Sequence, residues 1–109
     1  MTYNEILQLI ISKLGENYRS EDIEVLNNIL KEKISQASFI SNREIDITKK
    51  DDNLMLLSPE IIEATIISYD LRGSEYSKSQ SELGVSNTFI DVNETLRNNI
   101  IKNGKRVMF

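Results

Sequence analysis

The segment that decides the fold reads S-P-E-I-I-E-A-T-I-I-S-Y-D-L-R-G and spans Ser58–Gly73. Serine, proline and an acidic residue in this order form a strong helix start, because serine caps the first turn and proline needs no hydrogen-bond partner there. Apolar residues then fall on nearly every side of a helix predicted over Pro59–Arg72, which Gly73 should end. A helix that is apolar nearly all round is buried. We therefore expect it to be the central helix of an all-α domain.

A serine-rich stretch follows this helix and leads to residue 89. It holds Ser77, Ser79, Ser81 and Ser86, is punctuated by Gly84, and ends in the apolar pair Val85 and Phe89. Such a composition cannot fill a core, and a loop this long is usually functional or disordered. A solvated surface loop and a loop that orders against a partner fit it equally. We expect residues 75–89 to form a long loop, with positive φ at Gly84 and apolar anchors at Val85 and Phe89.

The chain ends in a predicted fourth helix and a short tail. Asp91 or Asn93 should cap this helix, and Asn103-Gly104 should end it. The tail Lys105–Phe109 joins two cations to three apolar residues. A frayed terminus is the ordinary reading, but exposed apolar residues also favour docking on another chain. We expect Lys105 and Arg106 to face acidic groups of a partner and Val107 and Phe109 to fill apolar pockets, so that the bundle does not need the tail.

Two further helices are expected upstream. The first should span residues 3–14, starting with a capping box between Thr2 and Glu5 and ending at Gly15. The second should run from about Glu21 to about Phe39 after a capping serine at 20. Its buried stripe should contain Ile23, Leu26, Leu30, Ile34 and Ala37. A short connection makes the two helices antiparallel neighbours.

The polar segment 41–53 connects the second and third predicted helices, and we expect it to project from the body. Asp51-Asp52-Asn53 within it is no calcium loop, because the spacing, the turn glycine and the terminal glutamate are missing. We expect a solvated turn there. The other acid pairs, Glu21-Asp22 and Glu60-Glu63, sit at helix starts, where capping and solvation explain them.

The composition excludes several classes of protein. The 109 residues fit one domain, 1–109, and contain neither cysteine nor histidine. Disulfides, thiolate sites, histidine ligands and catalytic triads are therefore absent, and no histidine can activate the serines. We expect no enzyme, no cofactor and no metal. The formal charge of −4 and the acidic face of the second helix argue against DNA binding. No apolar run reaches the roughly 20 residues of a membrane span, and no secretory signal is seen, so synthesis in the cytoplasm is expected.

In the second half of the chain four parts follow one another: a helix ending in Arg-Gly, a serine-rich S-x-S-E-x-G-[IV]-S segment, a short helix and a basic tail. The residues that carry this pattern are Tyr69, Leu71, Arg72, Gly73, Ser79, Ser81, Glu82, Gly84, Val85 and Ser86. The order of parts resembles the small head-tail connector (adaptor) proteins of tailed bacteriophages. The chain departs from the family pattern at Leu83 and at Glu75-Tyr76.

The resemblance implies a structural virion protein at the head-tail interface. Adaptors of this kind form a ring, typically of about twelve subunits, beneath the portal protein. The ring extends the DNA tunnel and offers a platform to a stopper-type, tail-proximal neck protein, while DNA passes without specific binding. An acidic subunit suits such a tunnel. The partner-binding residues expected from the loop, the tail and this resemblance are Arg72, Ser79, Glu82, Gly84, Val85, Phe89, Lys105, Arg106, Val107 and Phe109.

A second reading stays open. The same helical chain also fits a small intracellular regulator that binds a single protein partner and forms no ring. Copurification with a portal protein would separate the two.

Overall fold

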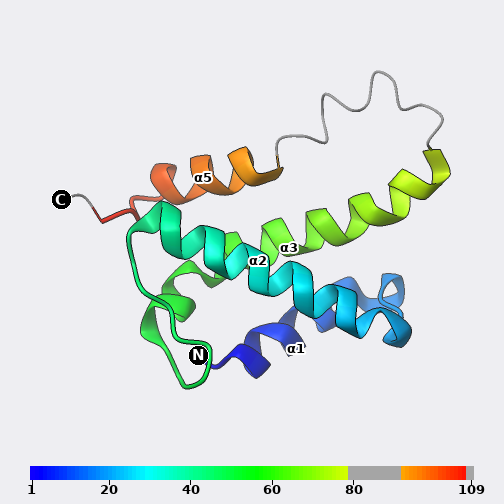
Figure 1. Cartoon of the computed structure of the whole chain (residues 1–109), viewed down its shortest axis with the longest axis horizontal. Coiled ribbons are helices and arrows are strands. Elements are labelled where there is room, and N and C mark those ends of the chain that lie inside the picture. The colour runs from blue at the N-terminus through cyan, green and yellow to red at the C-terminus, as the bar shows by residue number, and fades with distance from the viewer. Residues whose placement is uncertain (79–91, 108–109) are drawn as a thin grey trace.

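The computed structural model describes residues 1–78 and 92–107, with the side chains of residues 1–71 and 94–107. The described residues are all-α, as expected, and contain no strand. Two short 3₁₀ helices, Gly15–Asn17 and Ser20–Asp22, join the first two α-helices (Figure 1). The α-helices are α1 (Tyr3–Leu14), α2 (Ile23–Ser41), α3 (Asp52–Lys78) and α5 (Val92–Lys102).

Helix α1 has the predicted bounds, and its predicted capping box is present. The Thr2 hydroxyl accepts a hydrogen bond from the Glu5 backbone N–H at 3.2 Å, and the Glu5 carboxylate accepts one from the Thr2 N–H at 2.8 Å. Gly15 ends the helix with a φ of 55°, in the region that favours glycine. The buried face of α1 consists of Ile6, Leu7, Ile10 and Leu14.

Helix α2 begins and ends two residues later than predicted. Ser20 opens a 3₁₀ turn instead of capping the helix, and Ile23 remains 37% exposed, so the predicted stripe loses its first member. At the other end Asn42 takes the left-handed conformation with a φ of 59°. The N–H groups of Asn42 and Arg43 donate to the carbonyls of Phe39 and Ser38. This is a Schellman motif with asparagine in the glycine position.

Helix α3 is much longer than the predicted Pro59–Arg72. It begins at Asp52 because Asp51, which was expected in a solvated turn, caps it through a 3.0 Å hydrogen bond from the Leu54 N–H. Pro59 therefore lies inside the helix instead of at its start. At the other end the helix runs through Gly73 to Lys78, so the predicted end at Gly73 is wrong.

Pro59 removes one helical hydrogen bond, and the neighbouring serine replaces it. Proline has no N–H for the carbonyl four residues earlier, which belongs to Met55. The Ser58 hydroxyl donates to that carbonyl at 2.8 Å instead. Figure 1 shows the first turns of α3 at an angle to the rest of the helix, as expected where proline interrupts the ladder. Ser58 thus acts inside the helix and not as the predicted N-cap.

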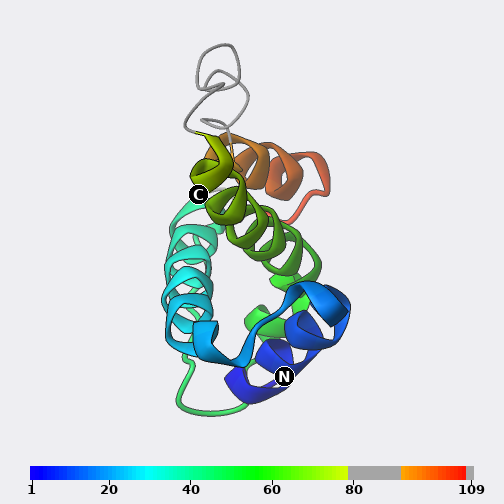
Figure 2. The same ribbon diagram turned by 90° about the vertical axis from the view of Figure 1, so that its right-hand side faces the viewer.

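Helix α3 is the central element, as predicted, since it contacts α1, α2 and α5. Figures 1 and 2 show α1 and α5 on opposite sides of the α2–α3 pair. The core is aliphatic, and Tyr69 is its one aromatic member among the described residues. The connection 42–51 does not project freely, because Ile45 and Ile47 pack against the core and the Asp51 N–H donates to the Met1 carbonyl.

Candidate partner-binding surfaces

The residues after α5 form a fixed structure that we call the C-terminal strap (residues 103–107). Helix α5 ends at Lys102, in agreement with the end predicted at Asn103-Gly104. The N–H groups of Gly104 and Lys105 donate to the carbonyls of Ile101 and Ile100, both at 3.0 Å, and Gly104 has a φ of 71°. This second Schellman motif reverses the chain and directs the strap toward the end of α2.

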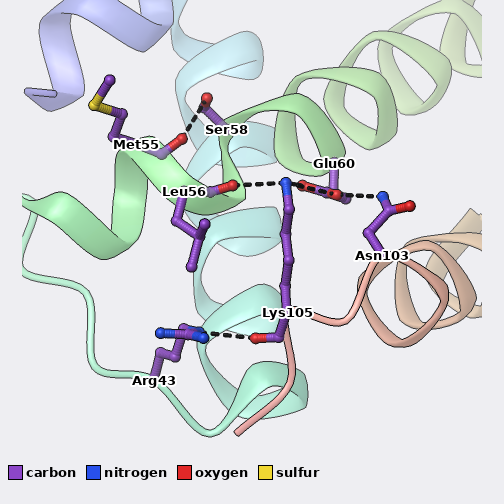
Figure 3. A network of polar contacts seen from close by, with 7 residues as sticks. All are labelled: Arg43, Met55, Leu56, Ser58, Glu60, Asn103 and Lys105. Atoms are coloured by element: carbon purple, nitrogen blue, oxygen red, sulfur yellow. Dashed lines mark hydrogen bonds and ion pairs between the residues drawn. The ribbon is translucent and has the colours of Figure 1, made fainter.

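The side chain of Lys105 is bound inside the subunit. Its ammonium group lies 3.0 Å from the carboxylate of Glu60 and donates to the Leu56 carbonyl at 2.8 Å (Figure 3). The Asn103 amide donates to the same carboxylate at 2.6 Å. Glu60 is only 3% exposed, and a buried carboxylate needs such partners to offset its lost hydration. The prediction that capping and solvation at a helix start explain Glu60-Glu63 is therefore wrong for Glu60, which is buried inside α3.

The backbone of the strap is held by the end of α2. The Arg43 side chain donates through Nε to the Lys105 carbonyl at 2.8 Å. The Val107 N–H donates to the Ser41 carbonyl at 2.8 Å, and the Asn42 amide donates to the Val107 carbonyl at 2.9 Å. Residues 105–107, which were expected to be dispensable for the bundle, are therefore hydrogen-bonded to it.

The strap presents one of the predicted partner-binding residues to solvent. Arg106 is exposed, whereas Lys105 and Val107 on either side are partly buried. The hydrogen bonds at Lys105 and Val107 fix the backbone on both sides of Arg106. The backbone of Arg106 is thus fixed near α2, α3 and the end of α5, while its charged side chain is open to solvent. Lys105, by contrast, already has its acidic partner in Glu60, so its expected pairing with a partner's acid needs revision.

The remaining predicted residues are not described in detail. Arg72 lies within α3, but its side chain is outside the description. Residues 75–78, which were predicted to belong to the loop, are helical and form the end of α3. The other predicted residues fall outside the described part of the chain: Ser79, Glu82, Gly84, Val85, Phe89 and Phe109.

Tyr69, a residue of the adaptor resemblance, has a role within the subunit. Its hydroxyl donates to the Asp22 carboxylate at 2.7 Å and accepts a hydrogen bond from the Arg19 N–H at 3.3 Å. Burial, and next the hydrogen bond to Asp22, raise the pKa of Tyr69. Tyr69 therefore ties the connection between α1 and α2 to the middle of α3.

A surface that the sequence reading missed lies between α2 and α5. We call it the Phe39 surface, and Phe39 is 82% exposed on it. The side-chain oxygen of Gln36 is buried there and has no hydrogen-bond partner among the described residues. An unsatisfied buried acceptor costs about 1–3 kcal/mol. The residues lining this shallow groove, about 810 Å³ in volume, are Ser35, Gln36, Phe39, Ile40, Glu94, Arg97 and Asn98.

The sequence did carry a signal for this surface. Phe39 follows Ala37 by two positions, which places it about 200° around the helix from the buried stripe at 100° per residue. The sequence reading treated it only as the end of the second helix. A single exposed aromatic side chain is common on protein surfaces, and Phe39 becomes a candidate because it lines the same groove as the unpaired Gln36 oxygen.

A second surface lies between α1 and the first turns of α3. We call it the Met55 surface; Met55 is 60% exposed and Leu9 is 42% exposed. They border an open hollow of about 760 Å³. Met55 lies before the predicted start of the third helix at Pro59, but the earlier start of α3 makes it helical and places it beside α1. The full lining is Met1, Thr2, Asn4, Glu5, Gln8, Leu9, Lys50 and Met55.

The described residues contain no group of three or more acidic residues that could hold a metal ion. The one strongly buried lysine, Lys33, lies 3.9 Å from the Glu32 carboxylate; burial lowers the pKa of Lys33, and Glu32 partly opposes this. Within residues 1–78 and 92–107, no helix is both long and apolar enough to cross a bilayer.

Comparisons with protein-family models, with curated proteins and with solved structures give no match.

Proposed function

We propose that the chain is a structural, non-enzymatic adaptor subunit of a tailed-phage neck. In this role it assembles as a ring beneath the portal protein, extends the DNA tunnel and offers a platform to a stopper-type neck protein. Its site of action is the head-tail interface of the virion. The ring would contain about twelve copies, the number implied by the resemblance.

The observation that carries the proposal is the order of parts in the second half of the chain. The Tyr69–Gly73 part of the resemblance lies on the central helix α3. A serine- and glycine-containing segment, the short helix α5 and a basic strap follow it. The all-α architecture of the described residues is compatible with that order.

The strap supplies a concrete contact for the portal. Arg106 is exposed and its backbone is hydrogen-bonded on either side, so binding costs the rotamer freedom of its side chain but little backbone entropy. Guanidinium groups bind carboxylates with two parallel hydrogen bonds. We therefore assign Arg106 to an acidic patch on the portal protein.

Capture on the cognate portal tests this assignment. Arg106→Glu should reduce the amount of chain retained on immobilised portal at least tenfold, because it replaces attraction by repulsion. Lys102→Glu is the matched control, since Lys102 is also an exposed cation. It is the last residue of α5, four positions before Arg106. The Lys102→Glu variant should bind nearly as the wild type does.

Two results would contradict the proposal. The wild-type chain failing to bind the portal at all would exclude the adaptor role. Equal loss of portal binding in Arg106→Glu and Lys102→Glu would show that binding depends on the overall positive charge of this region and not on Arg106 in particular. Binding of one chain to one unrelated cellular protein, with no affinity for portal, would favour the regulator reading instead.

A further inference from the structure

We propose that copies of this chain associate head to tail, with the Phe39 surface of one copy against the Met55 surface of the next. The inference deepens the proposed function, on which the ring itself rests, by naming the two faces that meet between subunits. It depends on the described surfaces and does not involve the predicted loop.

The two surfaces cannot cover each other within one subunit. The Phe39 surface is formed by α2 and α5, whereas the Met55 surface is formed by α1 and the start of α3. Figures 1 and 2 show α1 and α5 on opposite sides of the α2–α3 pair. One subunit therefore cannot join its own two surfaces, and each molecule can offer both surfaces to neighbours at once.

The two surfaces differ in shape in a way that suits direct contact. Phe39 is the most exposed large apolar side chain among the described residues, at 82%. On the other surface, Leu9 and Met55 border an open hollow. Methionine is flexible and polarizable, and it adapts to an aromatic ring more readily than a branched side chain does. A projecting ring on one surface and an adaptable hollow on the other are complementary.

The charges on the two surfaces are also complementary. Glu94 and Arg97 line the Phe39 surface, and Glu5 and Lys50 line the Met55 surface. Glu94, Arg97 and Lys50 form no ion pair among the described residues. If the two surfaces meet so that the acid of each faces the base of the other, Arg97 lies opposite Glu5 and Lys50 lies opposite Glu94. Such pairs fix orientation and suppress wrong partners.

The unpaired Gln36 oxygen gives a hydrogen-bonding reason for the same contact. It is buried on the Phe39 surface and lacks a donor among the described residues. The Met55 surface carries two exposed amide side chains, Asn4 and Gln8, each of which has donors to offer. Because the oxygen is buried, such a donor reaches it only when the Gln36 side chain turns outward as the two surfaces meet.

A contact between two different surfaces propagates. It leaves one Phe39 surface and one Met55 surface open at the ends of every dimer, so association continues until a ring closes or a filament grows. One aromatic side chain buries roughly 150–250 Å², whereas a stable interface needs about 800 Å² per partner. The isolated pair should therefore be weak, and ring closure on a template should strengthen it.

Site-directed crosslinking tests the inference, and the chain is suited to it because it contains no cysteine. Ser35→Cys marks the Phe39 surface and Gln8→Cys marks the Met55 surface; both positions are exposed. The two variants, carrying tags of different length, are mixed with a short bis-maleimide. We expect the mixed dimer to exceed either homodimer at least fivefold. A double variant with both substitutions should give a ladder of higher oligomers.

A second pair of variants tests whether formation of the mixed dimer requires Phe39. Phe39→Ala, added to the Ser35→Cys chain, should lower the mixed dimer at least fivefold and leave the urea midpoint unchanged, since the side chain is exposed. Ile23→Ala is the control, because Ile23 is an exposed apolar residue near the other end of α2. It should leave the crosslink unchanged.

Equal formation of homodimers and mixed dimers, or a mixed dimer that persists with Phe39→Ala, would overturn the inference. Portal capture keeps the two proposals distinguishable. If the wild-type chain loads onto portals in several copies but the mixed dimer never forms, the head-to-tail contact is wrong and the adaptor role stands. If the mixed dimer forms and no portal binding occurs, the contact stands without the adaptor role.

Discussion

The buried carboxylate of Glu60 binds two residues of the strap, close to the bend of α3. Its carboxylate is bound by Lys105 and Asn103, and the same ammonium group also reaches the Leu56 carbonyl. Removing one partner of a buried ion pair leaves an uncompensated charge, which typically costs about 3–5 kcal/mol. Lys105 keeps some exposure, so we expect Lys105→Ala to lower the free energy of unfolding by about 2–3 kcal/mol in urea titrations.

Two comparisons check the cause of that loss. Lys102→Ala, at an exposed position on the same helix end, should change stability by less than about 0.5 kcal/mol. The double variant Glu60→Met with Lys105→Met should recover most of the loss, because it removes both charges and keeps the volume. A Lys105→Ala variant as stable as Lys102→Ala would show that the ion pair does not hold the strap.

Tyr69 makes stability sensitive to alkaline pH. Its pKa is raised above the ordinary 10.0 by burial and by the hydrogen bond to Asp22. Above pH 10 the unfolded chain therefore ionises this tyrosine and releases a proton that the folded chain retains, so stability falls as pH rises. Tyr69→Phe should cost about 1–2 kcal/mol at pH 7 and should weaken the decline between pH 9 and about 11.

Tyr18→Phe is the matched control for that experiment. The Tyr18 ring lies 6.5 Å from the Tyr69 ring, centroid to centroid, so the change alters the same cluster without removing the hydrogen bond to Asp22. Urea titrations at several pH values measure both variants. An unaltered alkaline decline in Tyr69→Phe would refute the assignment to Tyr69.

At the level of elements, the strap behaves as part of the bundle. Its backbone is hydrogen-bonded to Ser41, Asn42 and Arg43, and its lysine balances Glu60. Deleting residues 105–109 should therefore lower the free energy of unfolding by about 2–5 kcal/mol. Circular dichroism during urea unfolding measures the loss. This is the reverse of what the composition of the tail suggested.

Deleting only residues 108 and 109 provides the control, since it leaves every described strap contact in place. That shorter deletion should have a small effect. If both truncated chains unfold at the urea concentration of the full chain, the strap contributes nothing to the fold and the contacts with α2 are incidental.

The elements that the sequence predicted well are those whose signals are local. The capping box fixes the start of α1, and Gly15 and Gly104 fix two helix ends, because each needs only a few adjacent residues. The start of α3 was missed because Ser58-Pro59 is as good a start signal as Asp51. The helix can start after Asp51 and continue through Pro59 because the Ser58 hydroxyl replaces the hydrogen bond that proline cannot make.

The candidate surfaces were predictable only in part. Basic and apolar residues in the tail marked it as a contact region, but its attachment to Glu60 joins residues 45 positions apart, which no local pattern reveals. The Met55 surface depends on how α1 packs against α3. Phe39 was visible in the helical period, but its significance depends on α5 leaving it uncovered.

For the whole molecule, the central claim is that many copies assemble on one portal. The isolated chain should be a monomer or a weak oligomer, because the surfaces described are small. The copies should close into a ring once a portal holds them together, since proximity raises their effective concentration.

The most direct test is the mass of the cognate portal complex after incubation with excess chain, measured by native mass spectrometry. We expect a saturating addition of about twelve subunits per portal ring, with few partly loaded particles because neighbouring copies stabilise one another. Phe39→Ala should give partly loaded particles. No added mass, or a stable dimer of the chain that does not bind the portal, would contradict assembly of many copies on one portal.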